Sequence, residues 1–215
     1  MLKLIAFDFD GTLADSVEFC ISSFEYVFEK YLGEKAPDRE TIYQHFGMNE
    51  IGIIRTFLGE INPAAEEDFF RFHRELHPVK CPEPYPGILP LLAFLKEKGV
   101  ELTVLTGRAE KSCKISMEFL NMGHYFSRFQ YGSPDKNDKC GHILNLLKDT
   151  GLQKDEILYV GDALSDVAAC KAAGVTCLAA AWASSARVEE LEKNNPGLVF
   201  RSVAAMKEYI ASELS

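Results

Sequence analysis

Short apolar runs recur along the chain and are typical of strands that are buried on both faces of a sheet. Residues 4–7 form the first run, Leu-Ile-Ala-Phe. Further strands are expected over 100–105, 129–131, 157–160, 175–179 and 198–200. Between them, apolar residues recur at helical spacing. Helices are expected over 88–98, 110–121, 139–148, 164–173, 187–193 and 203–214. This alternation predicts an α/β fold with a parallel sheet.

The segment between the first strand and about residue 82 has a different pattern. It shows no convincing strand between residues 15 and 80, and its apolar residues recur at helical spacing. Helices are expected over 17–31, 38–46, 49–57 and 66–77, with Asp38, Asn49 and Asn62-Pro63 as starts. A proline-rich connector follows at 82–87. The sequence therefore predicts a core of residues 1–14 and 83–215, interrupted by an all-helical insertion at 15–82.

Composition and charge narrow the function. The chain is 47% hydrophobic and 26% charged, as in globular proteins, and its net charge is −9. This charge argues against general nucleic-acid binding and against docking on an anionic membrane. The apolar runs are far shorter than the roughly 20 residues that span a bilayer. The N-terminus lacks a signal-peptide pattern and the six cysteines are scattered, so reduced thiols in a cytoplasmic protein are expected.

Polar motifs follow predicted strands or open predicted helices. They are Asp8-x-Asp10-Gly11-Thr12 after the first strand, Thr106-Gly107-Arg108 after the strand over 100–105, Lys139 at a helix start, and Gly161-Asp162 with Asp166 after the strand over 157–160. Because the carboxyl ends of parallel strands lie at one edge of a sheet, these residues are expected to converge there.

Such a cluster suits phosphoryl transfer. Several carboxylates in one crevice repel one another unless a cation is present, and Mg²⁺ binds a few carboxylates together with phosphate oxygens. Thr106, backbone N–H groups and Lys139 are donors suited to a phosphoryl group. One Asp can act as a nucleophile, and a second, two residues on, can protonate the leaving oxygen and then activate water.

The motifs also resemble a known family. The segments Phe7-Asp8-Phe9-Asp10-Gly11-Thr12-Leu13, Leu105-Thr106-Gly107-Arg108, Lys139 and Val160-Gly161-Asp162-Ala163-Leu164-Ser165-Asp166 are similar, in order and spacing, to the motifs of the haloacid dehalogenase (HAD) superfamily. Tyr131-Gly132-Ser133, Asp138-Lys139 and Ile143 resemble its phosphoglycolate-phosphatase-like branch. The resemblance implies a Rossmann-like core in which the insertion forms a helical cap.

The resemblance also implies roles for the acids and the lysine. Asp8 would attack phosphorus and form an aspartyl-phosphate, and Asp10 would serve as general acid and then base while its backbone carbonyl binds Mg²⁺. Lys139 would neutralise Asp8 and the phosphoryl oxygens. Asp8, Asp10, Asp162 and Asp166 form the expected metal set, Asp166 either as a ligand or as the residue that orients Lys139.

Other residues are expected to bind substrate. Thr106 and the Gly107 N–H would hold the phosphate, and the remaining candidates are Gly11, Thr12, Arg108 and, at the entrance, Arg55 with the turn at 45–49. Lys136 is an alternative to Lys139. We favour Lys139 because it opens the apolar helical pattern and fits the family spacing to Gly161.

The expected activity is Mg²⁺-dependent hydrolysis of a small phosphorylated metabolite, such as phosphoglycolate, by a monomer or homodimer. A β-phosphoglucomutase-like phosphotransferase, a pyrophosphatase and a binding protein without turnover stay open as alternatives. In family terms, the acid at Asp10 disfavours dehalogenation. Leu13 and Phe19 stand where a Ca²⁺-binding EF-hand loop needs Gly and Glu.

Aromatic and histidine residues of the insertion need a separate interpretation. His73 and His77 share a helix face at i, i+4 and could chelate zinc, but no third ligand is evident, so we expect surface histidines. Phe69, Phe70 and Phe72 are expected in the core of the cap.

Overall fold

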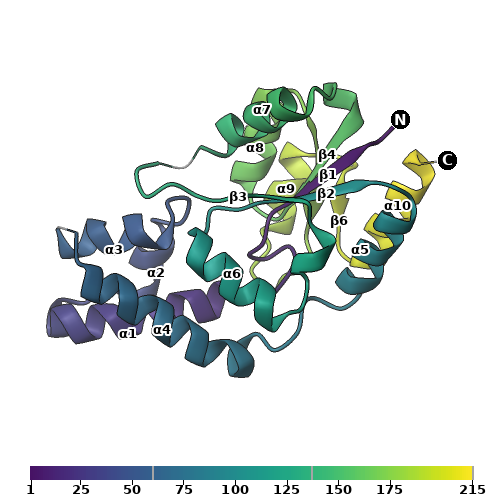
Figure 1. Cartoon of the computed structure of the whole chain (residues 1–215). Helices are drawn as coiled ribbons and strands as arrows, with labels where there is room; N and C mark the ends of the chain where they lie inside the picture. The colour runs from purple at the N-terminus through teal and green to yellow at the C-terminus, as the bar shows by residue number, and fades with distance from the viewer. Residues whose placement is uncertain (60, 137, 215) are drawn as a thin grey trace.

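A parallel sheet is the centre of the computed structural model, which describes residues 1–59, 61–136 and 138–214 (Figure 1). Its six strands lie in the order β3-β2-β1-β4-β5-β6, and all neighbours are parallel. The strands are β1 (Leu4–Phe7), β2 (Glu101–Leu105), β3 (Arg128–Gln130), β4 (Ile157–Gly161), β5 (Thr176–Ala180) and β6 (Val199–Phe200). The predicted strands and the α/β class are confirmed, with each strand boundary within one residue of its predicted position. The order reverses between β1 and β4, where such sheets bind ligands.

Helices cover both faces of this sheet. Ile5 and Phe7 on β1 point into a cluster with α5 (Ile88–Glu97), α6 (Glu110–Phe119) and α10 (Val203–Glu213). Leu4 and Ala6 point the other way, into a cluster with α7 (Lys139–Thr150), α8 (Leu164–Ala173) and α9 (Val188–Asn194). Successive side chains of a strand alternate between faces, so the continuous apolar runs reflect burial on both.

The segment between β1 and α5 is helical, as predicted, and lies to one side of the sheet (Figure 1). Its helices are α1 (Val17–Leu32), α2 (Arg39–Tyr43), α3 (Glu50–Leu58) and α4 (Pro63–Lys80). The three predicted starts are confirmed, because Asp38, Asn49 and Asn62 accept hydrogen bonds from backbone N–H groups of the first turns. Short 3₁₀ helices lie at Gly33–Lys35, Gly123–Tyr125 and Lys154–Glu156.

Two of these helices differ from their predicted lengths. α2 ends at Tyr43 rather than near residue 46. The turn that follows contains Gly47, whose φ of 125° is open to glycine but strained for other residues. α4 continues past His77 to Lys80. Within the described part of the chain, no helix has both the length and the apolar content needed to cross a membrane.

The helices α1–α4 share an apolar cluster of their own. Phe24, Phe28, Ile54 and Phe69 are its largest fully buried side chains apart from Ile42, and Ala109 and Ile115 at α6 join it. Phe69 and Phe70 lie in this cluster as predicted, whereas Phe72 stacks on Tyr26 nearer the surface. We call α1–α4 the cap. Because α6 packs against both the sheet and the cap, the two parts share one helix, and the predicted division at residues 14 and 83 stays a prediction.

The expectation that His73 and His77 are surface residues is wrong. Both are fully buried, and their rings pack on Phe19. His77 also stacks on Phe119, at the end of α6. Their helix face therefore points into the seam where α4 meets α1 and α6, and not toward solvent. Burial, reinforced by the nearby Arg108 guanidinium, lowers the pKa of His77 to about 4 and that of His73 well below its usual value.

These buried histidines predict a pH-dependent stability. In the unfolded chain a histidine has a pKa of about 6.5, so between that pH and about 4 the unfolded state binds more protons than the folded state. The contribution that these neutral histidines make to the unfolding free energy is fully present above about pH 6.5 and is lost as the pH falls toward about 4. In urea titrations, His77→Phe is expected to show a smaller loss of unfolding free energy between pH 7 and pH 5 than the wild type. The exposed-residue control His124→Gln should keep the wild-type loss, and an unaltered slope in His77→Phe would contradict this assignment.

Candidate active site

The carboxyl ends of β1 and β4 place Asp8 and Asp162 on opposite sides of the point where the strand order reverses. Asp8 follows β1 directly and Asp162 follows the last residue of β4. A cavity of about 210 Å³ opens there, and Asp8, Asp10, Lys139, Asp162 and Arg108 are among the residues that line it. Four of the five are acids or the lysine that the sequence assigned to one edge of the sheet, so the topology brings them together as expected.

Lys139, the first residue of α7, bridges two of the acids. Its Nζ donates hydrogen bonds to Asp8 Oδ2 and Asp166 Oδ1. Asp166 is fully buried and also accepts from the Tyr159 hydroxyl at 3.0 Å and the Ala163 N–H at 2.9 Å, so it is a fixed anchor for the ammonium. The alternative Lys136 lies elsewhere: it is 67% exposed and pairs with Asp138 at 2.7 Å.

Negative charge exceeds positive charge in this cluster. Burial raises the pKa of Asp8 to about 6 although the Lys139 ammonium opposes the shift. Burial also raises the pKa of Asp162 well above its usual value, and the charges of Asp166 and Asp8 add to the effect. Burial opposes the charge of Lys139, but Asp166 and Asp8 together raise its pKa. One ammonium therefore does not balance three carboxylates.

The donor set fits a divalent cation. Carboxylate oxygens of Asp8, Asp162 and Asp166 lie within 4.8 Å of one another. Gly11 makes this approach feasible, because a Cβ built at Gly11 would lie only 2.2 Å from Asp162 Oδ2 and its φ of 71° already favours glycine. Thr12 donates to Asp162 Oδ1 at 3.4 Å and so orients the acid instead of lining the cavity. An all-oxygen set with acidic members suits Mg²⁺.

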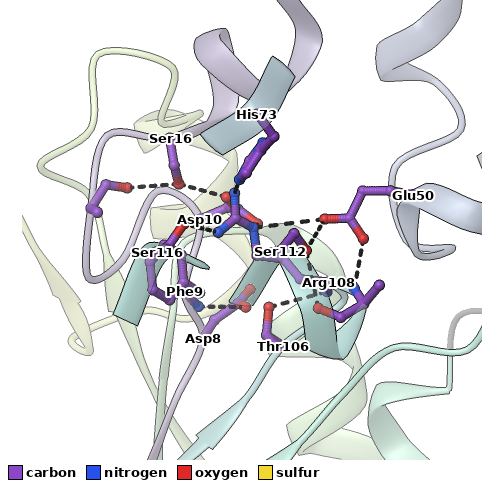
Figure 2. Close-up of polar contacts among 12 residues, drawn as sticks. Asp8, Phe9, Asp10, Ser16, Glu50, His73, Thr106, Arg108, Ser112 and Ser116 are labelled. Atoms are coloured by element: carbon purple, nitrogen blue, oxygen red, sulfur yellow. Dashed lines mark hydrogen bonds and ion pairs between the residues drawn. The ribbon is translucent and has the colours of Figure 1, made fainter. Parts of the chain in front are cut away.

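The Asp10 carboxylate is not part of this set, and its partners are Ser16 and Arg108 (Figure 2). Its Oδ1 accepts from the Ser16 hydroxyl at 2.5 Å, and its Oδ2 lies 3.3 Å from Arg108 Nε. The side chain of Asp10 nevertheless remains 23% exposed and lines the cavity. The two acids of the first motif thus lie in different environments, Asp8 against an ammonium and Asp10 against a guanidinium.

Arg108 lines the cavity, and most of its guanidinium contacts are with protein groups. It is 2% exposed, and its NH1 group donates to Ser116 Oγ at 2.6 Å while its NH2 group lies 3.2 Å from His73 Nε2 (Figure 2). Its Nε also lies 3.9 Å from Glu50. The guanidinium thus contacts protein groups on α6 and the cap, and its charge compensates two acids, the buried Glu50 and the partly exposed Asp10. These contacts support Asp10, and the predicted role of Arg108 in substrate binding stays a prediction.

Glu50 is a functional candidate that the sequence did not indicate. It is 3% exposed, accepts the Ala109 N–H at 2.6 Å and accepts a hydrogen bond from the Ser112 hydroxyl (Figure 2). Burial raises its pKa, and the charge of Arg108 opposes the shift. In the sequence, an acid directly after the Asn49 N-cap is typical of an exposed first helical turn, so no signal distinguished it. Through these two hydrogen bonds, Glu50 links the first turn of α3 to the first turn of α6.

The loop after β2 lies beneath the cap. Gly107 lines the cavity, and a Cβ built on it would lie 4.0 Å from the carbonyl oxygen of Gly47 in the cap. Thr106 is buried, and its hydroxyl accepts the Arg108 N–H at 3.2 Å. The predicted phosphate contacts of Thr106 and Gly107 stay predictions. Arg55 does not reach the entrance: it pairs with Glu66 on α4 at 3.3 Å and is absent from the described lining of the cavity.

Comparison with known proteins agrees with the motif order. Residues 5–180 match the model of the family described as haloacid dehalogenase-like hydrolase. The chain belongs to this family. Phosphoglycolate phosphatase 1 of Pseudomonas aeruginosa is 29% identical over 82% of this chain and 68% of its own length. Phosphoglycolate phosphatase of Aquifex aeolicus is 30% identical over 84% of this chain and 85% of its own length.

Solved structures show the same fold. The crystal structure of a predicted phosphoglycolate phosphatase from Haemophilus somnus superposes with a TM-score of 0.78, covering 97% of this chain and 98% of the other at 19% identity. The family match confirms the resemblance to the haloacid dehalogenase superfamily that the motifs indicated. The likeness to the solved structure confirms the Rossmann-like core.

The network around Arg108 predicts a large loss of stability when the guanidinium is removed. Arg108→Met leaves Asp10 and the buried Glu50 without their cation, and losing one partner of a buried pair typically costs about 3–5 kcal/mol. Arg74→Met is the matched control, because Arg74 pairs with Glu118 at the surface and such pairs contribute about 0–1 kcal/mol. Urea unfolding of both variants measures the difference. A loss in Arg108→Met as small as in Arg74→Met would show that the network does not stabilise the fold.

Proposed function

We propose that this protein is a Mg²⁺-dependent phosphomonoester hydrolase that works through an aspartyl-phosphate. The observation that carries the proposal is the cluster of Asp8, Asp162 and Asp166 at the reversal point of the sheet, two of which, Asp8 and Asp166, pair with Lys139. The names of the relatives, phosphoglycolate phosphatases, support hydrolysis of a phosphate ester.

Asp8 is oriented for attack. Its Oδ1 accepts the Phe9 N–H at 2.7 Å and its Oδ2 accepts from Lys139, so both carboxylate oxygens have fixed neighbours. In the proposed first step a carboxylate oxygen of Asp8 forms a bond to phosphorus as the bond from phosphorus to the leaving oxygen breaks. Asp10 donates its proton to that leaving oxygen, which departs as an alcohol.

The second step releases phosphate. Asp10, now ionised, takes a proton from water, and the water oxygen bonds to phosphorus while the bond from phosphorus to Asp8 breaks. Inorganic phosphate leaves and Asp8 is restored. Bound Mg²⁺ would supply the positive charge that Lys139 alone does not provide against the acids and the phosphoryl oxygens. Asp8 and Asp162 would hold it, with Asp166 either joining them or acting through Lys139.

Substitutions in the cluster test this function. Asp8→Asn removes the nucleophile, so release of phosphate from p-nitrophenyl phosphate with Mg²⁺ is expected to fall at least ~10³-fold while the circular dichroism spectrum stays that of the wild type. Lys139→Met is expected to lose about 10²-fold or more in kcat, since it removes the only ammonium on Asp8 among the described contacts.

Lys136→Met is the matched control, because it removes an exposed lysine three positions away in sequence. This variant should retain wild-type turnover. In the wild-type protein, chelation of Mg²⁺ with EDTA should abolish turnover, and added Mg²⁺ should restore it. Full activity in Asp8→Asn would end the proposal. Conversion of β-glucose 1-phosphate to glucose 6-phosphate without phosphate release, or hydrolysis confined to pyrophosphate, would instead assign the same core to a mutase or a pyrophosphatase.

A further inference from the structure

The two walls of the active-site cavity differ in chemistry. The core wall carries the acids and Lys139. The wall contributed by the cap is almost entirely apolar. Its members are Val17, Cys20, Phe24, Phe46, Met48 and Ile53, with Tyr43 at the rim. In a phosphoester bound with phosphorus at Asp8, the alcohol portion must face this cap wall.

The cap wall offers no cation to that alcohol portion. Among the described residues that line the cavity, the cations are Lys139 and Arg108, both from the core. Lys139 is engaged by Asp8 and Asp166, and Arg108 is buried between Asp10 and Glu50. The cationic candidate of the cap, Arg55, pairs with Glu66 outside the cavity.

Apart from the Tyr43 hydroxyl at the rim and the Cys20 thiol, the polar side-chain group that the cap contributes to the described lining is an acceptor. Glu50 is the charged side chain that the cap contributes to the described lining, and its carboxylate already accepts from Ala109 and Ser112. The Gly47 carbonyl oxygen faces the Gly107 loop. A carboxylate brought into this space would lose its water, gain no cation and lie near a second carboxylate, which disfavours binding. An uncharged carbon skeleton would bury apolar surface against phenylalanine, methionine and isoleucine side chains.

We propose that the site takes phosphate esters whose alcohol portion is small, uncharged and mainly apolar, and that it discriminates against esters bearing a carboxylate, such as phosphoglycolate. The inference rests on the proposed phosphatase function. The inferred substrate differs from the phosphoglycolate in the names of the relatives. The inference is drawn from the cap side chains that line the cavity, whereas the family motifs lie in the core.

The test compares two esters of the same shape. Isobutyl phosphate and 2-phosphoglycolate differ by replacing two methyl groups with two carboxylate oxygens. With Mg²⁺ and wild-type protein, kcat/KM is expected to be at least about tenfold higher for isobutyl phosphate. Equal or higher kcat/KM for 2-phosphoglycolate would overturn the inference.

A variant tests the physical cause. Met48→Lys places an ammonium on the half-buried cap wall and is expected to shift the kcat/KM ratio about tenfold toward 2-phosphoglycolate. Val79→Lys adds the same charge at a residue that is 73% exposed on α4 and should leave the ratio unchanged. A ratio that stays the same in Met48→Lys, or that moves equally in both variants, would count against the apolar wall as the cause.

Binding separates this inference from the proposed function. If neither ester releases phosphate, the phosphatase proposal fails, while calorimetric affinities of the two esters for the wild-type protein still decide the inference. Tighter binding of isobutyl phosphate supports it, and equal or tighter binding of 2-phosphoglycolate overturns it.

Discussion

Excess negative charge buried at one edge of a parallel sheet is the constraint on which the rest of this site depends. Strand order brings Asp8 and Asp162 to the reversal point, and α8 adds Asp166. Three carboxylates therefore lie together, and the Lys139 ammonium pairs with two of them. The surrounding structure accommodates this charge: Tyr159 and a backbone N–H hold Asp166, and the missing side chain of Gly11 leaves room for Asp162. A bound divalent cation would complete the balance of charge, and this need is the physical basis of the proposed Mg²⁺-dependent chemistry.

Arg108 provides compensating positive charge at the junction of core and cap. It compensates Asp10 and Glu50, and its other contacts reach Ser116 on α6 and His73 on α4. The acid proposed for proton transfer is thus supported by a cation that is itself held by both parts of the molecule. The apolar wall itself comes from the side chains of the cap. In the proposed account the charged core carries out catalysis, and the apolar cap selects the substrate.

The sequence predicted the sheet and the convergence of acids because both depend on local rules: apolar runs mark the strands, and parallel strands end at one edge. It did not predict the surroundings of individual polar side chains. Helical spacing showed that His73 and His77 share a face but not that α1 and α6 cover that face. The family resemblance implied that Thr106 and Gly107 bind phosphate. Only the tertiary packing shows that Glu50 lies 3.9 Å from Arg108, the next residue of this motif. The sequence likewise did not predict which cap side chains line the cavity, because this also depends on tertiary packing.

Calorimetric titration of Mg²⁺, combined with thermal unfolding, tests the central claim most directly, because it measures the charge balance without requiring a substrate. Wild-type protein is predicted to bind Mg²⁺ and to gain about 2.7 kcal/mol of unfolding free energy at a free concentration of about one hundred times Kd. Asp162→Asn should lose most of this gain, whereas Asp155→Asn, at an exposed residue outside the cluster, should keep it. Wild-type protein whose stability does not respond to millimolar Mg²⁺, or equal responses in the two variants, would contradict the account.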